Sequence, residues 1–161
     1  MKNRTIIRRW ILFFIVALVI SGATAIPVES ELNFLTRVFP LGTGIGDWLD
    51  RVLTGFTVTK THYPFLAYGY DWLAFAHFVL AVLFIGPLKD PIRNKWVIEF
   101  GLIACVLVIP YAMIAGSFRG IPLGWRLIDC SFGAAGLVPL GIVLKKIKRI
   151  ESSAQQQSHE D

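Results

Sequence analysis

Two side chains of opposite charge stand in the last apolar run of the sequence, where charge is costly. Arg126 and Asp129 lie within Ile121–Leu144, a stretch long enough to cross a bilayer. A charged side chain near the middle of a membrane helix costs about 2.5–3.5 kcal/mol on insertion scales. Residues three apart lie on one side of a helix and can touch. The spacing favours either a structural ion pair near the membrane surface or a polar interior that does chemistry.

A third charged residue and a histidine occupy an earlier apolar run, Pro64–Pro87. Asp71 and His77 are six residues apart, so they project about 120° from each other around a helix and form no tight site by themselves. Tyr70 shares the face of His77. A histidine inside a membrane can carry protons, bind a ligand or fill a hydrogen-bonded packing position.

Four antiparallel spans would bring these side chains to similar depth in one half of the membrane. The candidate ligand-binding or polar-interior residues are Asp71, His77, Arg126, Asp129, Tyr70 and Tyr111. Two acids and one arginine can hold a buried network, bind a cationic or zwitterionic headgroup, or pass protons. The pattern predicts a polar interior and leaves these three roles open.

The sequence contains no pattern that points to catalysis, a metal or a cofactor. It has no GxSxG, HExxH or phosphate-binding loop. Cys105 and Cys130 both fall in apolar runs and read as small packing residues. We therefore expect no catalytic residue, no metal and no cofactor, and the chain reads as a non-enzyme, although an enzymatic role stays open.

Composition indicates an all-α membrane protein. Of the 161 residues, 55% are apolar, too many for a soluble domain of this size. The predicted spans are Trp10–Ile26, Pro64–Pro87, Trp96–Phe118 and Ile121–Leu144. Lipid offers open backbone groups no hydrogen-bond partner, so the spans must be helical. We expect one membrane domain over residues 1–150, an antiparallel four-helix bundle, and a disordered cytoplasmic tail over residues 151–161.

Basic residues predict the orientation of the bundle. They cluster at Lys2–Arg9, Lys89–Lys95 and Lys145–Arg149, which are both termini and the second loop. Four spans put all three clusters on one side, and the positive-inside rule makes that side the cytoplasm. The net charge of +5 therefore serves topology, and we expect no nucleic-acid partner.

The first 26 residues fit two interpretations. A basic start, an apolar run and Ala23-Thr24-Ala25 match a cleaved secretory signal peptide. The same residues match a short uncleaved span with a cytoplasmic basic flank, which we favour. Residues 27 onward begin on the outer side in both cases.

The outer loop, residues 27–63, contains an amphipathic helix. Apolar residues recur at helical spacing from Ile45 to Phe56, and Asp47, Asp50 and Arg51 fill the opposite side. Such a helix lies flat on the membrane surface or covers the bundle as a lid. A shorter helix is predicted over Ser30–Phe39, with Ser30 as its N-cap.

Two resemblances come from these runs. Four runs within Tyr63–Leu144 resemble an uncharacterised family of small four-span bacterial membrane proteins, which implies a fold but no activity. These runs are YPFLAYGYDWLAFAHF, NKWVIEFG, IACVLVIP and RGIPLGWRLIDCSFG. A second set of residues is similar to a pattern of the VanZ-like family, which is linked to teicoplanin resistance. The set consists of Asp71, His77-Phe78, Arg126, Asp129, Gly133 and Gly136. The Asp71-to-His77 spacing is longer than that family's, and its last-span asparagine is missing.

Three functions follow as expectations for a bacterial plasma (inner) membrane protein. The first is a non-enzymatic accessory or subunit-type component that forms a homo-oligomer or joins a membrane partner through helix faces of small residues. The second, implied by the VanZ-like resemblance, is an outward-facing protein that binds or modifies a lipid or envelope precursor. The third is a small transporter or proton path. Membrane lipids are expected partners in every case.

Overall fold

The computed structural model describes residues 2–160, and over these residues it contains helices and no strand. In chain order the elements are α1 (Lys2–Thr24), α2 (Val28–Val38), α3 (Gly44–His62), α4 (Pro64–Leu83), α5 (Ile85–Lys89), α6 (Lys95–Phe118) and α7 (Leu123–Glu160). Four described segments are long and apolar enough to cross a membrane: Asn3–Thr24, Pro64–Lys89, Lys95–Phe118 and Leu123–Ser153. The predicted all-α class is confirmed, and these four segments are compatible with a small multi-pass membrane protein.

The helices extend beyond the predicted spans at both ends of the chain. α1 begins at Lys2 rather than at Trp10, because lysine and arginine are good helix formers. α7 continues to Glu160, through a polar segment for which the sequence predicts disorder from residue 151. Residues added to an existing helix do not meet the cost of helix nucleation, so a polar tail can continue it. Residue 161 lies outside the described residues.

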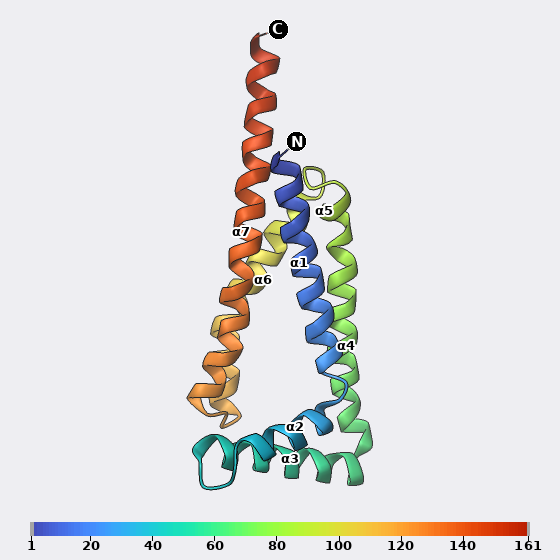
Figure 1. Cartoon of the computed structure of the whole chain (residues 1–161), viewed down its shortest axis with the longest axis vertical. Coiled ribbons are helices and arrows are strands. Elements are labelled where there is room, and N and C mark those ends of the chain that lie inside the picture. The colour runs from blue at the N-terminus through green and yellow to red at the C-terminus, as the bar shows by residue number, and fades with distance from the viewer. Residues whose placement is uncertain (1, 161) are drawn as a thin grey trace. The chain divides into compact units, whose positions relative to one another are not determined.

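The chain divides into two compact units, each of which is described by itself. The first comprises Met1–Val16 and Ala81–Asp161, and the second comprises Ala17–Leu80. In the first unit, α6 and α7 lie side by side as an antiparallel pair (Figure 1). Its large fully buried side chains come from α1, α5, α6, α7 and the turn residue before α5: Ile7, Ile11, Phe84, Pro87, Val97, Ile98, Leu140, Val143 and Ile147.

Glycines allow α6 and α7 to approach closely. A Cβ added at Gly133 would lie 2.5 Å from the carbonyl oxygen of Cys105, and one at Gly136 would lie 2.6 Å from the Cys105 Sγ. A Cβ at Gly116 would meet the Arg126 Cδ at 2.5 Å. The small-residue face predicted on the last span therefore packs against this chain's own α6, as close helix packing in membranes requires.

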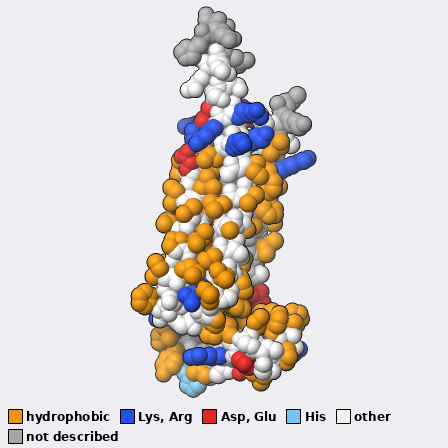
Figure 2. Space-filling model, turned by 90° about the vertical axis from the view of Figure 1, so that its left-hand side faces the viewer, with side chains coloured by type: hydrophobic (Ala, Val, Ile, Leu, Met, Phe, Trp, Pro, Cys, Tyr) orange, Lys and Arg blue, Asp and Glu red, His pale blue; other side chains and the backbone are white. Residues whose placement is uncertain are grey.

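Basic side chains collect at one end of the first unit. Figure 2 shows Lys and Arg gathered there, with hydrophobic side chains covering the helices away from that end. An ion pair between Lys95 and Glu151, 2.8 Å from Nζ to Oε2, links the start of α6 to the distal part of α7. Ile92 and Lys148 flank this pair. The second loop and the segment after the last predicted span thus share one end, as the topology prediction requires.

In the second unit, α2 and α3 form an antiparallel hairpin (Figure 1). Gly42 has a φ of +91°, a conformation that suits glycine. The Thr43 hydroxyl accepts a hydrogen bond from the Gly46 amide at 3.0 Å and caps α3. A Cβ at Gly46 would lie 2.1 Å from the Pro40 carbonyl oxygen, so only glycine fits this close approach.

The predicted amphipathic helix is confirmed as α3, with Leu49 buried on its apolar side and Asp50 exposed on the other. The shorter loop helix is also present, but it begins at Val28. Its N-cap position is Pro27, which makes no side-chain cap. The prediction of Ser30 as N-cap was wrong, because proline with its fixed φ is well placed to open a helix and moved the start upstream.

Candidate functional site

A cavity of about 480 Å³ opens in the second unit, where the loop hairpin meets the start of α4. It is formed by the segment that leads into α2, the last turns of α3 and the first two turns of α4. The lining residues are Ile26, Pro27, Val28, Glu29, Ser30, Phe56, Lys60, Pro64, Ala67, Tyr68, Tyr70 and Asp71. Polar groups and apolar walls thus face the same space, as in most sites for small molecules.

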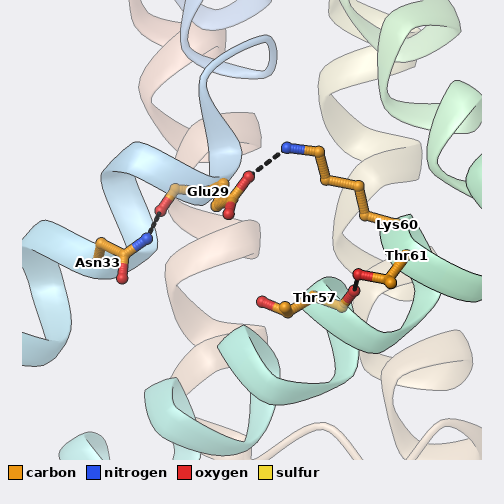
Figure 3. A network of polar contacts seen from close by, with 5 residues as sticks. All are labelled: Glu29, Asn33, Thr57, Lys60 and Thr61. Carbon is orange, nitrogen blue, oxygen red and sulfur yellow. Dashed lines mark hydrogen bonds and ion pairs between the residues drawn. The ribbon is translucent and has the colours of Figure 1, made fainter.

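The hairpin brings together the two charged residues of the loop that line this cavity. Because α2 and α3 are antiparallel, the first turn of α2 meets the last turn of α3, and the Lys60 Nζ donates to the Glu29 carboxylate (Figure 3). The Asn33 amide donates to the Glu29 backbone oxygen at 2.8 Å. The Lys60 side chain is 57% exposed and the Glu29 side chain 40% exposed, so the ion pair adds little stability. The main effect of the ion pair is that the positive charge of Lys60 is neutralised by Glu29.

Aromatic side chains form another side of the cavity. The rings of Phe56 on α3 and Tyr70 on α4 pack edge to face, with centroids 5.4 Å apart. Tyr68 also lines the cavity and packs edge to face on Trp72 at 6.0 Å. The Phe56–Tyr70 contact joins α3 to the first turns of α4, whereas the Tyr68–Trp72 contact lies within α4. The three rings that line the cavity also offer aromatic surfaces that attract cations.

Asp71 gives the cavity an uncompensated negative charge. Glu29 and Asp71 are the acids among the lining residues and Lys60 is the base, so the formal balance is two negative charges against one positive, or −1. Within the described residues, Asp71 makes no ion pair and no side-chain hydrogen bond, whereas Lys60 is paired with Glu29. The carboxylate of Asp71 is therefore available to a ligand.

The six sequence-predicted site residues fall in both units. Tyr70 and Asp71 line the cavity of the second unit. His77 belongs to the same unit but does not line this cavity. Its Nδ1 is 2.8 Å from the Leu73 carbonyl oxygen of its own helix, and its Cβ would lie 3.0 Å from a Cβ added at Gly22 of α1. His77 thus occupies a packing position between two helices.

Arg126, Asp129 and Tyr111 belong to the first unit. The Arg126 Nη1 donates to the Met113 carbonyl oxygen of α6 at 3.3 Å, and its stem covers Gly116. Within the part of the chain that the structure describes, Arg126 and Asp129 form no ion pair. Tyr111 is 73% exposed on α6. Arg126 therefore joins α7 to α6. Its helical spacing from Asp129 suggested an ion pair between the two residues, but the contact of Arg126 is with α6 instead.

Sequence reasoning missed Glu29, Lys60 and Phe56 as cavity residues. Phe56 was identified only as part of an apolar face, and Glu29 and Lys60 were not singled out. The signal was available in the order of the elements. Two short amphipathic helices joined by the five residues 39–43 must run antiparallel, which brings the start of one to the end of the other.

The described residues include no group of three His, Cys, Asp or Glu side chains placed to hold a metal ion. The arrangement in the second unit is instead one for binding a polar group next to apolar matter. No protein-family model, curated protein or solved structure matches this chain.

Proposed function

We propose that this protein is a non-enzymatic component of the bacterial plasma membrane that binds the headgroup of a lipid or a lipid-linked envelope precursor. The observation that carries the proposal is the cavity between the α2–α3 hairpin and the start of α4, with Asp71 free in it. The proposal is one of binding alone. It agrees with the VanZ-like resemblance at Asp71, the residue that the resemblance and the cavity share.

The place of the cavity in the fold supports a headgroup ligand. α2 and α3 are amphipathic, and such helices lie in the boundary between headgroups and acyl chains. α4 is one of the four segments apolar enough to span the membrane, and the cavity lies at its first two turns. A site at the junction of an interfacial hairpin and a span opens at the level of lipid headgroups.

The proposed orientation has the cavity on the outer side and both termini in the cytoplasm. The gathering of basic residues at one end of the first unit supports it through the positive-inside rule (Figure 2). A headgroup bound on the outer side would belong to a lipid of the outer leaflet or to a precursor already moved across the membrane.

Filling the cavity tests this function. Ala67 lines the cavity from α4, and Ala67→Phe is expected to reduce the amount of lipid that co-purifies with the full chain in mild detergent. Ala76→Phe is the matched control, because Ala76 is exposed on the same helix and does not line the cavity. Mass spectrometry of the bound lipid measures the effect. Equal lipid in both variants and the wild type would contradict the proposal.

A second candidate is an accessory role through helix contacts with a homo-oligomer or a membrane partner protein. One observation favours it: Gly69, Gly124 and Gly141 have no atom within 4 Å of an added Cβ, so these helix surfaces are open. Cross-linking in membranes tests it, with Gly141→Leu expected to reduce a cross-linked species. A transport role has less support, because the His77 ring is engaged with its own helix.

A further inference from the structure

The charge balance of the cavity narrows the class of headgroup, on the assumption that the proposed function holds. Lys60 is the basic residue that lines the cavity, and it is already paired with Glu29. Figure 3 shows the Lys60 side chain reaching from α3 to the Glu29 carboxylate. What remains for a ligand is the negative charge of Asp71. A purely anionic headgroup would meet an uncompensated carboxylate, whereas a cationic group would neutralise it.

The aromatic lining favours the same charge. Phe56, Tyr68 and Tyr70 all face the cavity, and the edge-to-face packing of Phe56 on Tyr70 holds their planes at 73° to each other. Two rings set nearly at right angles form a corner, and ring faces attract an ammonium group through their quadrupoles. Protein sites for ammonium ligands commonly combine such rings with a carboxylate.

The place of Asp71 on α4 leaves its carboxylate open to a ligand. Asp71 is seven residues into α4, which starts at Pro64, and this corresponds to about 10 Å along the helix. Asp71 is exposed and lines the cavity, so a cation can reach its carboxylate without displacing a partner within the described residues. Lys60 keeps donors beyond the one it gives Glu29, and these can meet the phosphate of a zwitterionic lipid.

We infer that the cavity selects phospholipids whose headgroup carries a positively charged amine, with Asp71 as the counter-ion of the amine and the corner of Phe56 and Tyr70 beside it. The shared chemistry is an ammonium group next to a phosphate. Phosphatidylethanolamine supplies it as a primary amine and phosphatidylcholine as a quaternary amine. Phosphatidylglycerol has the same phosphate and no amine.

The test is a competition among these three lipids with identical acyl chains. Delipidated full-length protein is incubated with an equimolar mixture, and native mass spectrometry counts the bound species. The wild type is expected to hold the two amine lipids in preference to phosphatidylglycerol, and their ratio shows which amine fits. Asp71→Asn is expected to lower the preference about tenfold, which corresponds to about 1.4 kcal/mol. Asp50→Asn, an exposed acid of α3 outside the cavity, is expected to retain it.

The outcomes separate this inference from the proposed function. If the wild type prefers phosphatidylglycerol, or binds all three lipids equally, the amine selectivity is overturned whether or not any variant folds. A uniform loss of all three lipids in Asp71→Asn would also overturn it. In these cases the proposed function stands as long as Ala67→Phe still lowers total bound lipid. If Ala67→Phe leaves total lipid unchanged, the proposed function falls and the inference falls with it.

Discussion

The side chain of Arg126 lies over Gly116 and donates to the Met113 carbonyl oxygen at 3.3 Å. Its Nε is buried without a hydrogen-bond partner among the described residues. Met113 lies in the last two turns of α6, and a backbone carbonyl oxygen has a second lone pair that can accept the guanidinium in addition to a helix hydrogen bond. This contact joins the two ends of the α6–α7 turn, and Asp129 takes no part in it.

A double-mutant cycle tests this assignment. Arg126→Gln is expected to lower the free energy of unfolding by about 1.5–3 kcal/mol, the contribution of a hydrogen bond from a charged group. The coupling between Arg126→Gln and Asp129→Asn is expected to stay below about 0.5 kcal/mol, as for residues without a shared contact. Denaturation of the four proteins in detergent measures it. A double mutant that recovers most of the single-mutant losses would instead show an ion pair between the two.

The candidate site was predictable from sequence only in part, and the reason is tertiary. Asp71 and Tyr70 stood out because polar residues in an apolar run are costly, and both line the cavity. Glu29 and Lys60 lie in a polar loop, where charge costs nothing and carries no signal. Their meeting depends on a turn that only Gly42 and Gly46 permit.

At the scale of helices, the interface of α6 and α7 depends on the absence of side chains at particular positions. Gly133 on α7 faces the backbone of α6, because its added Cβ would lie 2.5 Å from the Cys105 carbonyl oxygen. Gly141 on the same helix has nothing within 4 Å. The Cys130 thiol, 3.7 Å from the Ile109 carbonyl oxygen, adds a contact along this interface.

Alanine substitution separates the two glycines. Gly133→Ala is expected to destabilise the protein by about 1–3 kcal/mol, because a backbone atom cannot move aside cheaply. Gly141→Ala is expected to be neutral or to stabilise by up to about 1 kcal/mol, since alanine favours the helix. Thermal unfolding in detergent compares them. Equal effects of the two substitutions would show that Gly133 does not hold the close approach.

Helices that depend on a repeating apolar pattern were predicted well, and their ends were not. α3 follows from the spacing of apolar residues between Ile45 and Phe56, and the structure extends it from Gly44 to His62. The start of α1 at Lys2 and the extension of α7 to Glu160 have no apolar pattern to mark them. Propensity alone decides such ends, and it is a weak guide.

At the scale of the molecule, the predicted topology requires the three basic clusters to share one side of the membrane. In the first unit, Lys95 and Glu151 join the second loop to the segment after α7's apolar stretch, and the basic side chains gather at that end (Figure 2). The number and the order of the apolar helices could be predicted from hydropathy, because lipid imposes their length. Hydropathy could not predict whether residues 1–26 are cleaved from the mature protein, because a signal peptide and a short span share one pattern.

The packing of α1 bears on that choice. Ile7 and Ile11 are fully buried, and the Phe14 ring lies 4.7 Å from the Phe84 ring in the first unit. A cleaved signal peptide would leave this core unfilled. We therefore expect N-terminal sequencing of the purified protein to read from the start of α1, and a mature N-terminus near Ile26 would refute this.

Substitutions at neighbouring positions of α1 test the same point through stability. Ile11→Ala is expected to cost about 2 kcal/mol, the low end for a buried isoleucine, because lipid tails supply apolar contacts in the unfolded reference state. Leu12→Ala is the control, since Leu12 is 52% exposed and meets lipid in both states. Thermal unfolding of the two variants measures the difference. A loss at Ile11 alone means that α1 is a permanent part of the core, whereas no loss at either position means that the protein is stable without it.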